Sequence, residues 1–89
     1  MDKEQIKEKL KKEGYTEINV YDDSANEIFP DHTHEGEQKL VVVRGSMEVK
    51  MEGKEYSLTP GDELVFPAKV VHSAKMGPEG CEYIDGEKA

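Results

Sequence analysis

Residues 40–66, LVVVRGSMEVKMEGKEYSLTPGDELVF, contain the clearest structural pattern in the chain. Within them, Met47, Val49 and Met51 alternate with polar residues. Successive side chains of a β-strand point to opposite faces, so this alternation predicts a strand with one buried face. The compact run from Leu40 to Val43 predicts a strand that is buried on both faces.

Turn signals divide this region at regular intervals. Gly45, Gly53 and Gly61 lie eight residues apart, which is the spacing of one strand and one turn in an antiparallel sandwich or barrel. Glu52-Gly53 predicts a hairpin turn. A further turn is predicted at Pro60-Gly61-Asp62, with a strand over Leu64–Phe66 after it. The region is therefore predicted to be all-β and antiparallel.

The first 14 residues have a different period. Ile6 and Leu10 share one helical face, Asp2 can cap the helix with Gln5 as its reciprocal partner, and Gly14 can end it. The apolar stripe is narrow, which predicts a helix of about three turns that lies against something larger. We therefore expect one domain, with residues 1–14 as an N-terminal helix packed on a barrel formed by residues 15–89.

Two further strands are predicted between the helix and the histidines. Ile18 and Val20 alternate with polar residues, and a polar turn follows them. Residues 27–29 resume a strand, which we expect Pro30 to end because proline has no N–H to donate.

The composition limits the choice of partners. Of the 89 residues, 35% are apolar and 36% are charged, so the core is thin and a homodimer is expected, because self-association often supports small domains. A net charge of -8 repels phosphate backbones, which argues against nucleic acid as a partner.

The cysteine content and the apolar runs favour the cytoplasm. Cys81 is the single cysteine of the chain and cannot form an intramolecular disulfide. The longest apolar run, Leu40 to Val43, is far shorter than the ~18 residues of a membrane span, so no membrane partner is expected. No arginine lies near Cys81 in the sequence and no histidine is closer than His72, which favours a packed thiol over a nucleophile.

The three histidines of the chain carry the functional signal. His32 and His34 lie two apart in an extended segment and so share one face. His72 follows after two hairpins, and Gln38 has the parity of His34. Imidazole suits divalent Fe, Mn, Ni, Cu and Zn, so the residues predict a site for one such ion, with open positions for water or a small organic molecule.

The first part of this pattern resembles a motif of the cupin family. Pro30-Asp-His-Thr-His34, followed by Gln38 and Gly45, is similar to the first cupin motif, in which H-x-H is followed by E and then by G. Two positions depart from that motif: Gln38 stands where it has glutamate, and Asn26 stands where it begins with glycine.

The second cupin motif has a counterpart further along the chain. Gly61, then Pro67-Ala68, then His72 resemble its pattern of G, P-x-G and H. Here Lys69 stands where the motif has glycine and Met76 stands where it has asparagine. Lys69 would cost about 1 kcal/mol if its φ is positive.

The resemblance covers roughly residues 27–83 and implies a fold and a ligand set. It implies an all-β double-stranded β-helix, an antiparallel barrel or jelly roll, usually dimeric, with a metal inside. The ligands carried over are His32, His34, Gln38 and His72.

Gln38 leaves two alternatives open. A neutral ligand would leave the charge of the ion uncompensated, which weakens binding and makes bound water more acidic. Otherwise Gln38 is not a ligand, and Glu35 and Glu37 are charged alternatives. Their odd parity points them away from the histidines unless Gly36 allows a bulge.

Three functions remain compatible with these residues. The first is a metal-dependent enzyme, for which dioxygenases and isomerases are the cupin classes that fit, although the sequence identifies no catalytic acid or base. The second is a non-catalytic module that binds a small molecule, with or without a metal, and the third is a structural dimer whose metal only stabilises a thin core. Apolar and aromatic side chains are expected to fill the barrel and to line the pocket near the ion: Met47, Met51, Tyr56 and Phe66.

Overall fold

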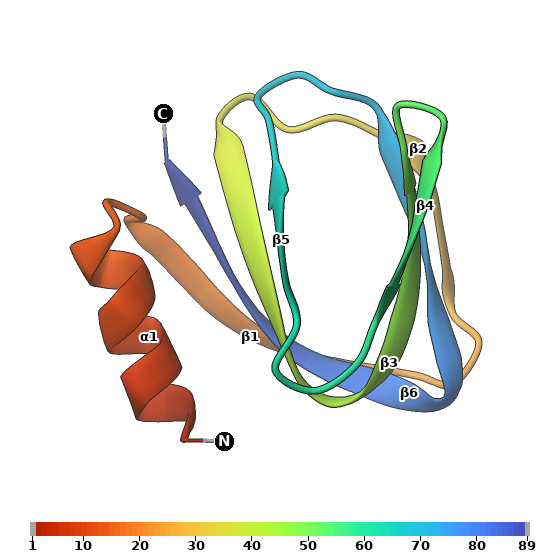
Figure 1. Ribbon diagram of the computed structural model, residues 1–89, viewed down its shortest axis with the longest axis horizontal. Helices are drawn as coiled ribbons and strands as arrows, with labels where there is room; N and C mark the ends of the chain where they lie inside the picture. The colour runs from red at the N-terminus through yellow and green to blue at the C-terminus, as the bar shows by residue number, and fades with distance from the viewer. Residues whose placement is uncertain (1, 89) are drawn as a thin grey trace.

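The computed structural model describes residues 2–88 and shows a barrel with one helix beside it (Figure 1). The helix, α1, is followed by six antiparallel strands, β1 to β6, so the all-β prediction is confirmed. The bounds of the elements are α1 (Lys3–Lys12), β1 (Glu17–Asp23), β2 (Ile28–His32), β3 (Glu37–Met51), β4 (Lys54–Leu58), β5 (Glu63–Phe66) and β6 (His72–Lys88).

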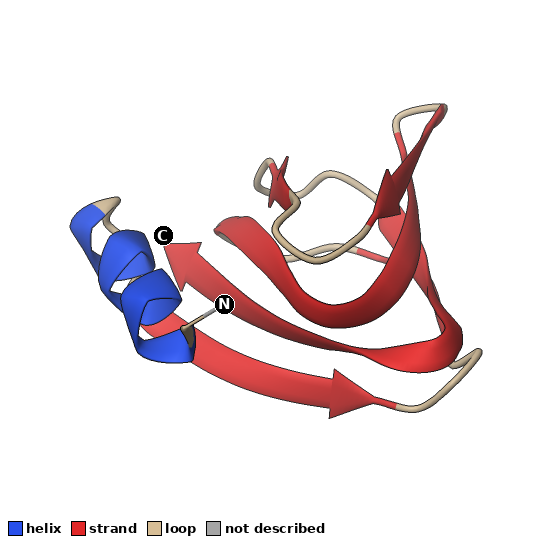
Figure 2. Cartoon of the chain, turned by 60° about the horizontal axis from the view of Figure 1, so that its bottom comes forward, coloured by secondary structure: helices blue, strands red, loops and turns tan. Residues whose placement is uncertain are grey.

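Two long strands, β3 and β6, form the frame of the barrel. They pair with each other from end to end, and each shorter strand pairs with one half of one of them. The strands β1 and β2 line the free edge of β6, whereas β4 and β5 line the free edge of β3. Figure 2 shows both long strands curving, so that their halves form two walls facing each other.

The long strands bend where two glycines meet. The register moves from Gly45 opposite Cys81 to Met47 opposite Met76, so β6 carries extra residues at this point. Gly45 has a φ of +81°, and a Cβ there would lie 2.1 Å from the carbonyl oxygen of Gly80. Only glycine allows the two backbones to approach this closely.

The turns follow the predictions with one correction. Glu52 and Gly53 form the predicted two-residue hairpin, both with positive φ, between β3 and β4. The prediction that Pro30 ends its strand is wrong, because β2 continues to His32. Proline is tolerated there because β2 is an edge strand whose pairing with β6 shifts between Phe29 and His32.

The sheet is apolar on both faces. Leu40 and Val42 belong to the main core inside the barrel, whereas Val41 belongs to a second core beneath the helix. The prediction of a strand buried on both faces is therefore confirmed. Besides these residues, the main core contains Met47, Val49, Met51, Leu58, Phe66, Met76, Cys81 and Tyr83.

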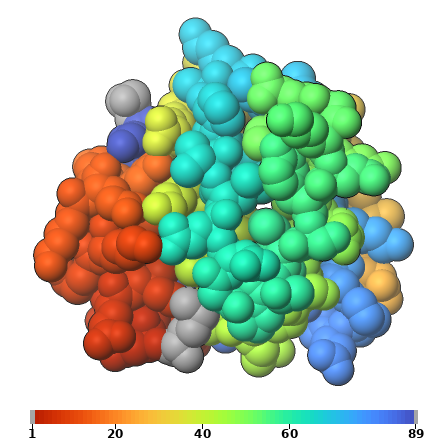
Figure 3. Space-filling model, viewed as in Figure 1, coloured from red at the N-terminus to blue at the C-terminus, as the bar shows by residue number. Residues whose placement is uncertain are grey.

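The helix packs on the outer face of the sheet. Its apolar stripe, Ile6 and Leu10, contacts the second core, which also contains Tyr15 and Ile84. Asp2 caps it by accepting a hydrogen bond of 2.9 Å from the N–H of Glu4. Figure 3 shows the helix forming one side of the molecule. Within residues 2–88 no helix has both the length and the hydropathy of a membrane span.

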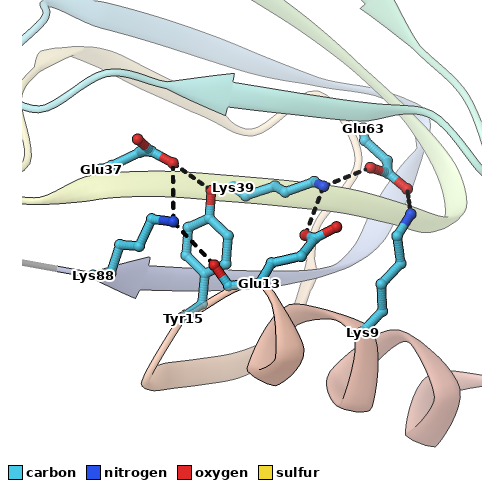
Figure 4. A network of polar contacts seen from close by, with 7 residues as sticks. All are labelled: Lys9, Glu13, Tyr15, Glu37, Lys39, Glu63 and Lys88. Carbon is cyan, nitrogen blue, oxygen red and sulfur yellow. Dashed lines mark hydrogen bonds and ion pairs between the residues drawn. The ribbon is translucent and has the colours of Figure 1, made fainter.

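A polar network links the helix region to the neighbouring strands (Figure 4). The Lys39 ammonium lies 2.8 Å from a carboxylate oxygen of Glu13 and 2.9 Å from one of Glu63. Lys9 of the helix also pairs with Glu63, at 2.8 Å. Burial acts to lower the pKa of Lys39, but the two carboxylates outweigh it and raise the pKa. The ammonium therefore stays charged and ties the end of the helix to two strands.

Cys81 is a core thiol, and its reactivity is expected to report unfolding. Its side chain is fully buried, and burial raises its pKa to about 11, so little thiolate forms at neutral pH. We expect a disulfide reagent such as DTNB to label native protein at least ~100-fold more slowly than protein in guanidinium. Equal rates in the two states would contradict this packing.

Candidate metal centre

The pairing of β2 with β6 brings the three histidines together. His32 is the last residue of β2 and lies directly opposite His72, the first residue of β6. His34 follows in the loop that leads to β3. The ring centroids of His32 and His72 are 4.3 Å apart, and His34 lies 5.2 Å from each of them. The predicted convergence of the three imidazoles is therefore present.

The histidine rings fit a divalent transition metal. One ring nitrogen from each lies within 4.8 Å of the others, comparable with the roughly 3 to 4 Å between nitrogens that share one ion at about 2.1 Å. The Nδ1 of His32 is 2.7 Å from the carbonyl oxygen of Pro30, and that of His72 is 3.2 Å from the carbonyl oxygen of Val70. A carbonyl only accepts, so Nδ1 carries the proton and Nε2 is free to bind an ion.

His72 is the most buried of the three, with 4% of its surface exposed. Its ring packs against that of Phe66, with the centroids 4.4 Å apart. Burial lowers its pKa, the Val70 carbonyl opposes this effect, and the two neighbouring histidines add to it. The ring is therefore neutral at neutral pH, which is the form that binds a metal.

A strained residue fixes the loop that carries His34. Lys69 has a φ of +65°. This is the positive φ whose energetic cost was considered for Lys69 in the sequence analysis. Its N–H donates a hydrogen bond of 2.8 Å to the carbonyl oxygen of His34. The strain of about 1 kcal/mol is offset by this backbone contact, which holds the loop of the candidate ligand His34 in place.

Gln38 lies at the same site, whereas Glu37 does not. The Gln38 side chain is buried, lines the cavity of the histidines, and donates a hydrogen bond of 2.7 Å from Nε2 to Oδ2 of Asp85. Glu37 instead accepts a hydrogen bond of 2.6 Å from the hydroxyl of Tyr15, beside the helix. Glu35 is exposed, and it is not among the described residues that line the cavity of the histidines.

A cavity of about 350 Å³ opens beside the histidines. Of the four side chains expected to line it, Met47 and Phe66 do so, and Met51 and Tyr56 are not among its lining residues. Met51 is part of the barrel core, and Tyr56 packs against that core. The cavity is lined by histidines, by apolar side chains and by further polar groups: His32, His34, His72, Phe29, Leu40, Met47, Phe66, Ala74, Met76, Tyr21, Asp23, Glu27, Gln38, Tyr83 and Asp85.

The sequence analysis missed the acidic residues behind the candidate ligands. Asp85 and Glu87 lie two apart on β6, so they share one face of the strand. Asp85 accepts from Gln38, and Oε1 of Glu87 lies 3.8 Å from Nδ1 of His34. The period-two spacing of these two acidic residues is the available sequence signal, and no strand is predicted over their segment from the sequence.

Asp85 is expected to lower the stability of the metal-free protein above pH 6. Burial raises its pKa to about 6, the hydrogen bond from Gln38 opposes this, and Glu87 and Asp23 add to it. Because the pKa of Asp85 in the folded protein exceeds the usual aspartate value of 3.8, its contribution to stability is most favourable below pH 3.8 and is lost as the pH rises through 6. With EDTA present, Asp85→Asn should raise the free energy of unfolding by about 1 to 3 kcal/mol at pH 7.

Parallel urea titrations of both proteins between pH 4 and pH 8 would measure this difference. It should shrink as the pH falls toward 4. A difference that does not vary with pH, or a variant that is less stable at pH 7, would contradict the assignment.

The comparisons with known proteins agree with the fold and the motifs. A family model described as a cupin domain matches residues 20–85. An RmlC-like cupin from Shewanella frigidimarina is 29% identical, with a TM-score of 0.72 over 81% of this chain and 65% of its own. KdgF from Halomonas sp. is 27% identical, with a TM-score of 0.68 over 81% and 69%.

A cupin-like protein from Thermotoga maritima is 29% identical, with a TM-score of 0.69 over 80% of this chain and 56% of its own. The chain thus spans between 56% and 69% of the length of these three structures. None of the curated proteins compared with it matches the sequence. The family model covers most of the chain, and the chain therefore belongs to the cupin family.

Proposed function

We propose that this cupin binds one divalent transition metal through His32, His34 and His72, with Gln38 as a fourth group, and uses it to hold a small organic molecule. The observation that carries the proposal is the approach of three imidazole nitrogens to within 4.8 Å of one another beside a cavity. A bound ion would supply Lewis acidity and open positions for water or a ligand.

The cavity residues support the binding of a small molecule over a purely structural ion. A volume of about 350 Å³ is within the range of small-molecule sites. Phe29, Leu40 and Phe66 provide apolar walls that exclude water, while Tyr83 and Asp85 provide polar groups that can orient a ligand. A structural ion needs no such space beside it.

Cobalt substitution separates an open site from a closed one. The protein is freed of metal, loaded with Co²⁺ and titrated with azide as a small probe ligand. An open position predicts a saturable change in the visible Co²⁺ spectrum. A spectrum that azide leaves unchanged would indicate a closed structural site and contradict the proposal.

Catalysis and self-association remain predictions at this point. Dioxygenase- or isomerase-like chemistry would use the same open positions, and the non-catalytic alternative would use the same cavity for binding alone. The homodimer rests on the composition and on exposed apolar side chains such as Ile28, which is 66% exposed. Sedimentation of the purified protein would test it.

A further inference from the structure

We propose that Asp85 is a positioning residue of the metal site, which supplies the negative charge that Gln38 lacks and turns the amide oxygen of Gln38 toward the ion. This inference rests on the proposed function. It explains how a glutamine can stand where the first cupin motif has a glutamate: the carboxylate is present, one hydrogen bond further from the ion.

The direction of the hydrogen bond carries the first step. Asp85 Oδ2 accepts from Nε2 of Gln38 at 2.7 Å. An ionised carboxylate only accepts, so it selects the NH₂ side of the amide and rejects the oxygen side. The Oε1 of Gln38 is then directed away from Asp85. Gln38 lines the same cavity as the histidines. Because its Nε2 is bonded to Asp85, the free atom of its amide is the oxygen, which is the atom that binds metals.

The burial of Asp85 carries the second step. Its side chain is 8% exposed, and within residues 2–88 no lysine or arginine lies within ion-pair distance of it or lines the cavity. A buried carboxylate without a cationic partner is costly. A divalent ion at the histidines would be the missing positive charge, because Asp85 lines the same cavity as they do.

The neighbouring carboxylate on the same strand lies near a second candidate ligand, without a hydrogen bond to it. Glu87 accepts from the N–H of Gly36 at 3.2 Å, and its other oxygen lies 3.8 Å from Nδ1 of His34. The strand β6 therefore places two acidic side chains behind two of the four candidate ligands. A carboxylate that hydrogen-bonds a ligand, as Asp85 does with Gln38, orients that ligand and strengthens metal binding.

A charge swap tests the inference through metal affinity. Zn²⁺ affinity is measured by competition with a chromophoric chelator at pH 7.5 for the natural protein, Asp85→Asn, and the double variant Gln38→Glu with Asp85→Asn. Asp85→Asn should bind Zn²⁺ about 10- to 100-fold more weakly. This is the typical loss when a group that hydrogen-bonds a metal ligand is removed. The double variant returns the carboxylate to position 38, and its amide at position 85 can donate to it. Its affinity should therefore recover to within a few-fold of the natural protein.

Two controls separate the inference from other effects. Asp22→Asn removes the same charge from an exposed residue outside the cavity and should leave the affinity unchanged within a few-fold. Melting temperatures of all variants verify folding, and Asp85→Asn should not be less stable without metal.

The outcomes distinguish this inference from the proposed function. An unchanged affinity in Asp85→Asn, an equal loss in Asp22→Asn, or a loss that the double variant does not recover would each overturn the role of Asp85 and leave the metal site intact. A natural protein that does not bind Zn²⁺ would instead refute the proposed function itself.

Discussion

Replacing His72 with phenylalanine is expected to abolish tight metal binding while leaving the barrel folded. His72 is the buried member of the histidine cluster and lies opposite His32 in the sheet. Zinc sites with four ligands bind with about 10 to 16 kcal/mol, so the loss of one ligand should cost about 3 kcal/mol, or more than 100-fold in affinity. A phenyl ring fills the space of the imidazole beside Phe66 and offers no lone pair.

Isothermal titration with Zn²⁺, together with the melting temperature with and without the ion, measures this effect. The natural protein should melt at a higher temperature when Zn²⁺ is present, and His72→Phe should not respond. Ser73→Ala is a matched control on the next residue of the same strand, whose side chain points to the other face. Binding by His72→Phe that equals that of the control would remove His72 from the site.

Replacing Gly45 with alanine is expected to disrupt the barrel. The added Cβ would meet the carbonyl oxygen of Gly80 at 2.1 Å, in backbone that cannot easily move because β3 and β6 are paired on both sides of the bend. The positive φ of Gly45 adds strain for any residue with a Cβ. We expect a loss of roughly 3 kcal/mol or more, which in a domain of this size lowers the melting temperature by more than ~12 °C.

Gly53→Ala is the matched control for this substitution. Gly53 also has a positive φ, +76°, but a Cβ there would meet no atom within 4 Å. Its cost should be about 1 kcal/mol, since only the backbone conformation is unfavourable. Equal losses in the two variants, measured by thermal unfolding, would show that backbone conformation and not the close approach of the strands limits the fold.

The strands and the shared face of His32 and His34 were predictable because they depend on local periods. Alternation around Val49 identifies the inner face of β3, and the turn at Glu52-Gly53 sets its register with β4. The spacing of His32 and His34 needs only an extended chain. His72 joined them through the family motif, which carries long-range information that periodicity does not.

The features that were missed depend on contacts between distant segments. Asp85 is a site residue because β6 lies beside β3, so that its carboxylate meets Gln38, and no local pattern reports this pairing. Met51 shares a face with Met47, but it is further along the strand and belongs to the core, not to the cavity lining. Pro30 interrupts a strand by local rules, yet the edge position of β2 tolerates it.

The metal content of protein purified without an affinity tag tests the central claim most directly. After dialysis and addition of one equivalent of Zn²⁺ or Fe²⁺, elemental analysis of the desalted protein should find close to one ion per chain. A parallel sample of His72→Phe should retain little. Natural protein that retains far less than one ion per chain after loading would contradict the claim that these three imidazoles form a metal centre.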